Sequence, residues 1–192
     1  MTKKHFPKIP GISTMQTQTD TTAPTQHAAP SLYLAGKIGK NDWRHNLVPN
    51  LRDRKWKDGP IETDSFLYVG PFFVSCDHGC GHSPGGHGLV QECIEPYYTH
   101  DDVIRLNMVA IEEADIVFAY ITAPDCHGTI FEIGVAAAKG KRVVMAFAPD
   151  IDANDFWFIS MQCAAVHHYI RPCCLAEILK DEIQKTISAG CK

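Results

Sequence analysis

The chain has 192 residues, of which 45% are hydrophobic and 21% are charged, and its formal net charge is −4 with histidine neutral. This composition is typical of a globular protein, and the lack of a basic excess argues against a nucleic-acid polymer as a partner. No apolar run approaches the ~20 residues that span a membrane, and the N-terminus lacks the apolar core of a signal peptide, so we expect a cytoplasmic protein without membrane association.

The first 30 residues have the composition of a tail. The stretch STMQTQTDTTAPTQHAAP, residues 13–30, is rich in Thr, Gln, Ala and Pro and has almost no large apolar side chain. Such a segment cannot bury enough apolar surface to offset the entropy lost on ordering. We therefore predict a disordered tail over residues 1–30 and a single domain over residues 31–192.

The first half of that domain contains two apolar segments typical of strands. SLYLAG is a short apolar run that ends in glycine, and FLYVGPFFVSC is rich in β-forming residues but is interrupted by Gly70-Pro71. Between them we predict a short helix followed by a polar loop. The ranges are 31–36 for the first strand, 40–51 for the helix, 52–65 for the loop and 66–76 for the interrupted strand segment.

The second half alternates helices with strands. Helical patterns cover residues 101–114, 129–139 and 172–190, strand patterns cover 115–121, 142–148 and 165–170, and residues 154–164 form a helix or an ordered loop. Because the strands are almost continuously apolar, they predict an α/β fold with a doubly wound, mostly parallel sheet, flavodoxin- or Rossmann-like, covered by helices on both faces. Ligands bind beyond the carboxyl ends of such strands. That rule gathers Tyr33, Gly36, Asp77 and Asp125 as candidate site residues.

Glu132 is an acidic residue within a small, apolar helical segment, DCHGTIFEIGVAAAKGK. If Thr129 is the helix cap, Glu132 stands at the third helical position, where it can complete a capping box with the Thr129 backbone N–H. Alternatively, an ionised glutamate at the carboxyl edge of the sheet is a nucleophile for an anomeric carbon. The small residues around it, such as Gly128, leave room for a sugar.

The series LYLAG, AIEEADIVFAYI and PDCHGTIFEIGVAAAKGK resembles the nucleoside 2-deoxyribosyltransferase family over residues 31–147. The resemblance implies that Glu132 attacks C1′ of the deoxyribose and that Tyr33 orients it. It also implies that Asp125, Gly128 and Thr129 lie around the substrate. The implied partners are a small nucleoside or nucleotide and a free nucleobase.

One position departs from the family pattern. Asn107 stands where the family has an aspartate that grips the base or the sugar. An amide can hydrogen-bond but cannot transfer a proton in the same way. Three activities therefore stay open: transfer of the sugar to a second base, hydrolysis with water as acceptor, and nucleotide binding without turnover.

The loop DHGCGHSPGGHG is rich in glycine and histidine and looks like an insertion found in one branch of the family. It allows a zinc site, for which the ligands are Cys76, Cys80, His82 and His87. We favour a loop that folds over the substrate, with Asp77 and His78 at the strand end as binding residues, and no cofactor. A surface loop stabilised by hydrogen bonds between histidines and the backbone is the third interpretation.

Residues 154–163, NDFWFISMQC, form a dense apolar cluster where the family presents residues to a neighbouring subunit. Most such clusters are core. If part of the cluster is exposed, it indicates an oligomer with shared sites. We expect a homo-oligomer.

Overall fold

The computed structural model describes residues 29–39, 43–49, 51, 59–71 and 100–190. Within these residues six strands form one sheet, in the order β2-β3-β1-β4-β5-β6. The strands are β1 (Ser31–Gly36), β2 (Ile61–Glu62), β3 (Leu67–Gly70), β4 (Ile116–Ile121), β5 (Arg142–Phe147) and β6 (Ala165–His167). Neighbouring strands are parallel, except that β2 runs antiparallel to β3. The fold is the predicted α/β fold with a mostly parallel sheet.

The order of the parallel strands places a topological switch point in the middle of the sheet. From β1 the chain goes first to β3 on one side and then crosses to β4 on the other side. This is the flavodoxin-like order, in which ligands bind at the carboxyl ends of the two strands that flank the switch. Here those strands are β1 and β4, which end at Gly36 and Ile121.

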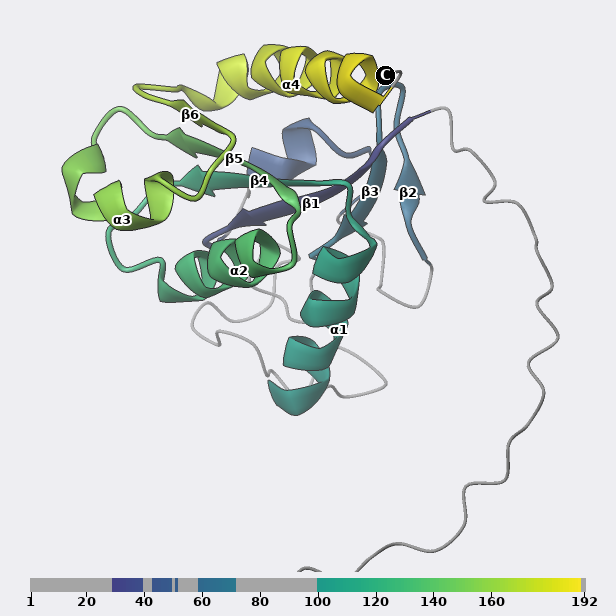
Figure 1. The fold of residues 1–192 in the computed structure, drawn as a ribbon, viewed down its shortest axis with the longest axis horizontal. Helices are drawn as coiled ribbons and strands as arrows, with labels where there is room; N and C mark the ends of the chain where they lie inside the picture. Colours follow the sequence, from purple (N-terminus) through teal and green to yellow (C-terminus); the bar gives the residue numbers. More distant parts are fainter. Residues whose placement is uncertain (1–28, 40–42, 50, 52–58, 72–99, 191–192) are drawn as a thin grey trace, which may run out of the picture.

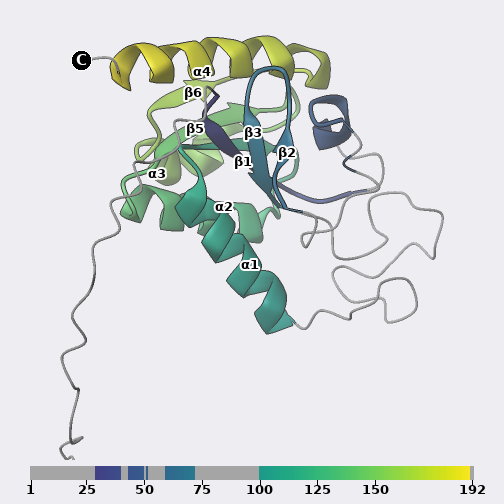
Figure 2. The same cartoon turned by 90° about the vertical axis from the view of Figure 1, so that its right-hand side faces the viewer.

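Helices cover both faces of this sheet (Figures 1 and 2). One face carries α1 (His100–Glu113), α2 (His127–Ala138) and α3 (Trp157–Ser160), whereas α4 (Leu175–Gly190) lies across the other. Short 3-10 helices, η1 (Trp43–Asn46), η5 (Ala153–Phe156) and η6 (Pro172–Cys174), complete the described elements. None of the helices that the structure describes is long and apolar enough to cross a membrane.

The strands separate two hydrophobic cores because successive side chains point to opposite faces. On β1, Leu32 and Leu34 pack with Trp43 and with α4, whereas Tyr33 and Ala35 pack on the side of α1 and α2. The alternation therefore sends Tyr33 to the face on which α2, with Glu132, is placed.

The edge strand β2 corrects one prediction, since residues 52–65 were expected to form a loop throughout. Ile61 and Glu62 pair with Tyr68 and Leu67 of β3. Two residues are too few to show the alternation by which a strand is detected. Residues 52–58 of the predicted loop lie outside the described residues, as do residues 1–28 of the predicted tail.

Candidate functional site

Tyr33 and Glu132 meet on the α1–α2 face of the sheet. Tyr33 stands in the middle of β1 and is wholly buried. Its hydroxyl donates a hydrogen bond of 2.6 Å to Oε1 of Glu132, a residue 99 positions later in the chain. The two residues that the sequence singled out as a glutamate and its orienting tyrosine are therefore in direct contact.

Glu132 does not cap its helix, and the capping-box interpretation is wrong. α2 begins at His127, preceded by Cys126 without a side-chain cap, and the Ile130 N–H already bonds to the Cys126 carbonyl. Thr129 thus lies inside the first turn rather than before it, and Glu132 falls in the second turn. From there its side chain reaches Tyr33 on the sheet.

The environment of Glu132 disfavours the ionised form of its carboxyl overall, although two neighbouring groups partly offset the effect of burial. Burial raises the pKa of Glu132, whereas the hydrogen bond from Tyr33 and the charge of Arg44 act in the opposite direction. Burial and the adjacent carboxylate raise the pKa of Tyr33 well above its ordinary value, so the phenol keeps its proton and acts as the donor. Among the described residues, the partly buried Glu132 carboxyl has one hydrogen-bond donor, Tyr33, and its ionised form is a candidate nucleophile.

Gly36 and Arg44 shape the carboxyl end of β1. Arg44 is fully buried, and its Nη2 donates a 2.7 Å hydrogen bond to the Gly36 carbonyl. A Cβ at Gly36 would stand 3.0 Å both from that nitrogen and from the Tyr120 carbonyl. Glycine is needed here because neighbouring groups approach so closely.

Lys37 and Asp125 pair across the switch point. Lys37 directly follows β1, Asp125 lies in the turn between β4 and α2, and the Lys37 ammonium is 2.7 Å from both carboxylate oxygens. The hydrogen bond and the charge of Lys37 hold the pKa of Asp125 below its ordinary value. At the carboxyl edge of the sheet Asp125 is therefore an acceptor rather than a proton donor.

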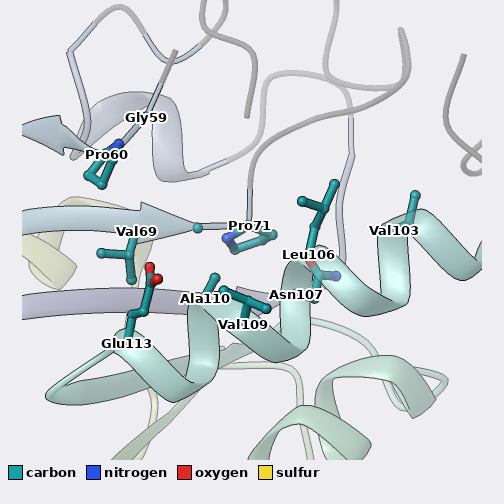
Figure 3. Close-up of a pocket in the computed structure, with 11 residues that line it drawn as sticks. Gly59, Pro60, Val69, Pro71, Val103, Leu106, Asn107, Val109, Ala110 and Glu113 are labelled. Atoms are coloured by element: carbon teal, nitrogen blue, oxygen red, sulfur yellow. The ribbon is translucent and has the colours of Figure 1, made fainter. Parts of the chain in front are cut away.

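Asn107 lies on α1 in a separate pocket (Figure 3). This pocket has a volume of about 220 Å³, and its walls include Gly59, Pro71 and Ala110, but neither Tyr33 nor Glu132. Gly70 connects the two places, because it lines the pocket and a Cβ on it would stand 3.2 Å from the Tyr33 ring. The structure therefore places Asn107 apart from Glu132, in a pocket that adjoins Tyr33 through Gly70.

The remaining predicted residues divide into two groups. Gly128 and Thr129 belong to the first turn of α2, one exposed and the other buried. The loop residues lie outside the described part of the chain: Cys76, Asp77, His78, Cys80, His82 and His87. In the part that is described, no three His, Cys, Asp or Glu side chains gather in a way that could hold a metal ion.

Sequence reasoning missed Arg44. Nothing in the segment WRHN distinguishes a buried arginine from an exposed one, because arginine is mostly a surface residue. The available signal was its place shortly after a predicted buried strand, beside a tryptophan.

The part of the chain that contains these residues matches the model of a known protein family. The model of the nucleoside 2-deoxyribosyltransferase family matches residues 32–159, about two thirds of the chain. No curated protein matches the chain. The matched segment includes Tyr33, Asn107, Asp125 and Glu132. The chain therefore belongs to the nucleoside 2-deoxyribosyltransferase family.

Proposed function

We propose that this protein cleaves the N-glycosidic bond of a nucleoside, with 2-deoxyribose as the sugar, and transfers the sugar to another base through a covalent intermediate on Glu132. The contact that carries this proposal is the partly buried 2.6 Å hydrogen bond between Tyr33 and Glu132, beside the switch point. Membership of the family supports the same reaction class.

In the proposed first step a carboxylate oxygen of Glu132 forms a bond to C1′ as the bond between C1′ and the base nitrogen breaks. The electron pair of that bond leaves with the base, which takes up a proton. The transition state resembles an oxocarbenium ion, and a neighbouring carboxylate stabilises its positive charge. Tyr33 holds the carboxylate in a single orientation, which reduces the entropy lost on reaching the reactive geometry.

In the second step a ring nitrogen of the acceptor base attacks C1′, the C1′–oxygen bond to Glu132 breaks and the carboxylate is released. That nitrogen loses its proton, which balances the proton taken up by the departing base in the first step. In this proposal Asp125, whose pKa is lowered by Lys37, accepts a hydrogen bond from an N–H of either base. Water in place of the acceptor base would make the protein a hydrolase. Binding without either step would make it a nucleotide-binding module.

The first experiment is a chromatographic assay with each of the four deoxynucleosides, with and without a second free base. The variants are Glu132→Gln and, as a matched control, Glu177→Gln on the exposed side of α4. We expect a new deoxynucleoside only when the second base is present, made by the wild type and by the control but not by Glu132→Gln. Release of free base without formation of a new deoxynucleoside would instead identify a hydrolase. If neither nucleosides nor nucleotides are turned over, the result would favour a nucleotide-binding module without catalytic activity.

A second experiment examines the intermediate itself. A 2-deoxy-2-fluoro nucleoside slows both steps, because fluorine destabilises the oxocarbenium-like transition state. Intact-protein mass spectrometry should show one added fluorosugar, and peptide mapping should place it on Glu132. A wild type that turns over deoxynucleosides but gives no adduct would argue against the covalent route.

We also propose that the protein is a homo-oligomer. Large apolar side chains are exposed on two helices that contact each other: Phe131 on α2, and Trp157, Phe158 and Met161 on or just after α3. Contiguous exposed apolar side chains are typical of protein–protein contact sites, and a second copy is the partner always present. Light scattering should give a mass above 21.3 kDa, and Trp157→Ser with Phe158→Ser should reduce it. A monomeric wild type at assay concentrations would contradict this.

A further inference from the structure

Arg44 is a buried cation at the carboxyl end of β1. The residue is 0% exposed, its Nε donates to the Leu34 carbonyl at 2.6 Å, and its Nη2 donates to the Gly36 carbonyl at 2.7 Å. Its guanidinium also lies 4.7 Å from the centroid of the Trp43 ring. A buried charge is expensive, so such a group is retained only where several contacts stabilise it.

The Leu34 and Gly36 carbonyls, to which Arg44 donates, point in the direction of the neighbouring strand β3. They lie beyond the last described residue pair between β1 and β3. The Pro30 carbonyl accepts from Leu67 of β3, and the Ser31 carbonyl accepts from Asp115 on the β4 side. Because successive carbonyls of a strand alternate in direction, those of Leu34 and Gly36 face the same side as that of Pro30. In the described residues, pairing of β1 with β3 ends at Tyr33 and Gly70.

Arg44 therefore takes the place of strand N–H donors for the last residues of β1. Its planar fork can reach two carbonyls two residues apart, which the single head group of a lysine cannot do with the same rigidity. The Gly36 position, where a Cβ would be 3.0 Å from Nη2, leaves the space that this geometry needs.

The segment held in this way begins one residue after Tyr33. A shift of Leu34 would turn β1 and move the Tyr33 hydroxyl, which bonds Glu132 at 2.6 Å. The charge of Arg44 also acts on the pair directly. Against the dominant effect of burial, it lowers the pKa of Glu132, and it lowers that of Tyr33 as well.

We propose that Arg44 is a positioning residue of this site, which braces the carboxyl end of β1 and thereby aims the Tyr33 hydroxyl at Glu132. This inference rests on the proposed function for its kinetic consequence. Arg44 acts through Tyr33 and does not touch the substrate. The described groups that act electrostatically on the Glu132 carboxylate are Tyr33 from β1 and Arg44 from η1.

The test compares Arg44→Lys, which keeps the charge but not the fork, with Arg44→Met, which removes both. Arg142→Met is the matched control, because Arg142 also bonds a buried partner, Glu182, but on the α4 face of the sheet. Thermal unfolding is measured first, and the kinetic assays are made well below each midpoint.

We expect Arg44→Lys to lower kcat about 10-fold with little change in KM, since substrate contacts remain. Arg44→Met should lower kcat about 100-fold and move the acidic limb of the pH profile of kcat/KM to higher pH, because the ionised form of Glu132 loses a favourable charge. Arg142→Met should lower the unfolding midpoint and leave kcat and the acidic limb unchanged. Wild-type kcat in a folded Arg44→Lys variant would overturn the proposal, even if Arg44→Met did not fold.

A measurement independent of turnover separates this inference from the proposed function. Carboxyl carbons of 13C-labelled glutamate are titrated by NMR, and the Glu132 signal is assigned by its loss in Glu132→Gln. The Glu132 midpoint should rise from wild type to Arg44→Met and stay in place in Arg142→Met. A wild type without turnover but with this shift would refute only the proposed function, whereas an unchanged midpoint would refute the role of Arg44.

Discussion

Two glutamates lie on opposite faces of the sheet, Glu132 partly buried and Glu182 buried, and the groups around their carboxyls differ. Glu132 on α2 has a neutral phenol at hydrogen-bond distance. Glu182 on α4, with a side chain only 1% exposed, has Arg142 at 2.6 Å, Lys185 at 2.7 Å and His167 at 3.4 Å.

The different surroundings shift the pKa values of Glu132 and Glu182 in opposite directions. Burial raises both, but at Glu182 the hydrogen bonds and charges of Lys185 and Arg142 prevail and lower the pKa. At Glu132 the phenol and the Arg44 charge are not enough, and the pKa stays raised. A carboxylate saturated by cations is stable and unreactive. Among the described residues, Glu132 has one neutral donor, which under the proposed function leaves its carboxyl oxygens available for reaction with a sugar.

The largest expected effect is the contrast in turnover between the two glutamates. Glu132→Gln should lower kcat by about 10³-fold or more, because the attacking oxygen is lost, while the amide oxygen still accepts from Tyr33. Its free energy of unfolding should be unchanged or slightly higher, because the substitution removes a partly buried carboxyl whose ionisation is unfavourable. Steady-state kinetics and urea unfolding measure both. A large loss of stability would mean that Glu132 is structural.

Tyr33→Phe should have the next largest effect. Without the phenol, Glu132 loses its donor, so kcat should fall about 10- to 100-fold and the acidic limb of kcat/KM should move to higher pH. Tyr120→Phe is the matched control, because its hydroxyl bonds the Ile170 carbonyl on the α4 face. Equal losses of kcat in the two variants would contradict the proposal that the Tyr33 hydroxyl orients Glu132 for the reaction.

Glu182→Gln should reverse the pattern of Glu132→Gln. It leaves partly exposed Arg142 and Lys185 without their carboxylate, so the free energy of unfolding should fall by about 1 to 3 kcal/mol, less than for a wholly buried pair. Turnover should stay within about twofold of wild type. A folded Glu182→Gln variant with strongly reduced turnover would contradict the view that Glu182 contributes to stability and not to turnover.

The smallest expected effect concerns how the free energy of unfolding changes with pH. The two glutamates should contribute to this pH dependence with opposite signs. The folded pKa of Glu182 lies below its unfolded value, so its stabilisation is present above the unfolded pKa and is lost as pH falls through the folded pKa. The folded pKa of Glu132 lies above its unfolded value, so its contribution is present at low pH and is lost as pH rises through the folded pKa. Unfolding of the wild type and of each glutamine variant between about pH 3 and 8 should show the two trends. Slopes of the same sign would contradict the comparison.

The sequence predicted the fold well because its signals were local. The apolar runs of β1, β4 and β5 are long enough to identify buried parallel strands, and their alternation with helices implies the sheet. β2 escaped detection because two residues at an edge carry no period.

The site was predicted in part, for a physical reason. The contact of Tyr33 with Glu132 followed from strand ends and from the family resemblance. The capping role given to Thr129 was wrong because local sequence cannot tell where a helix begins to within two residues. Arg44 could not be found because its burial depends on where β3 stops beside β1, which is a property of the assembled sheet.

The contact of Arg44 with Leu34 differs from the contact of Tyr33 with Glu132 in how far apart the two residues lie along the chain. Arg44 is ten residues from Leu34, whereas Tyr33 and Glu132 are 99 residues apart. Closing a short loop costs less entropy than closing a long one. The contact between Arg44 and β1 can thus form while most of the chain is still unfolded. The orientation of Tyr33 would then be fixed before Glu132 packs against it. The geometry of the Tyr33–Glu132 contact would therefore depend on an early, local step of folding rather than on a late one.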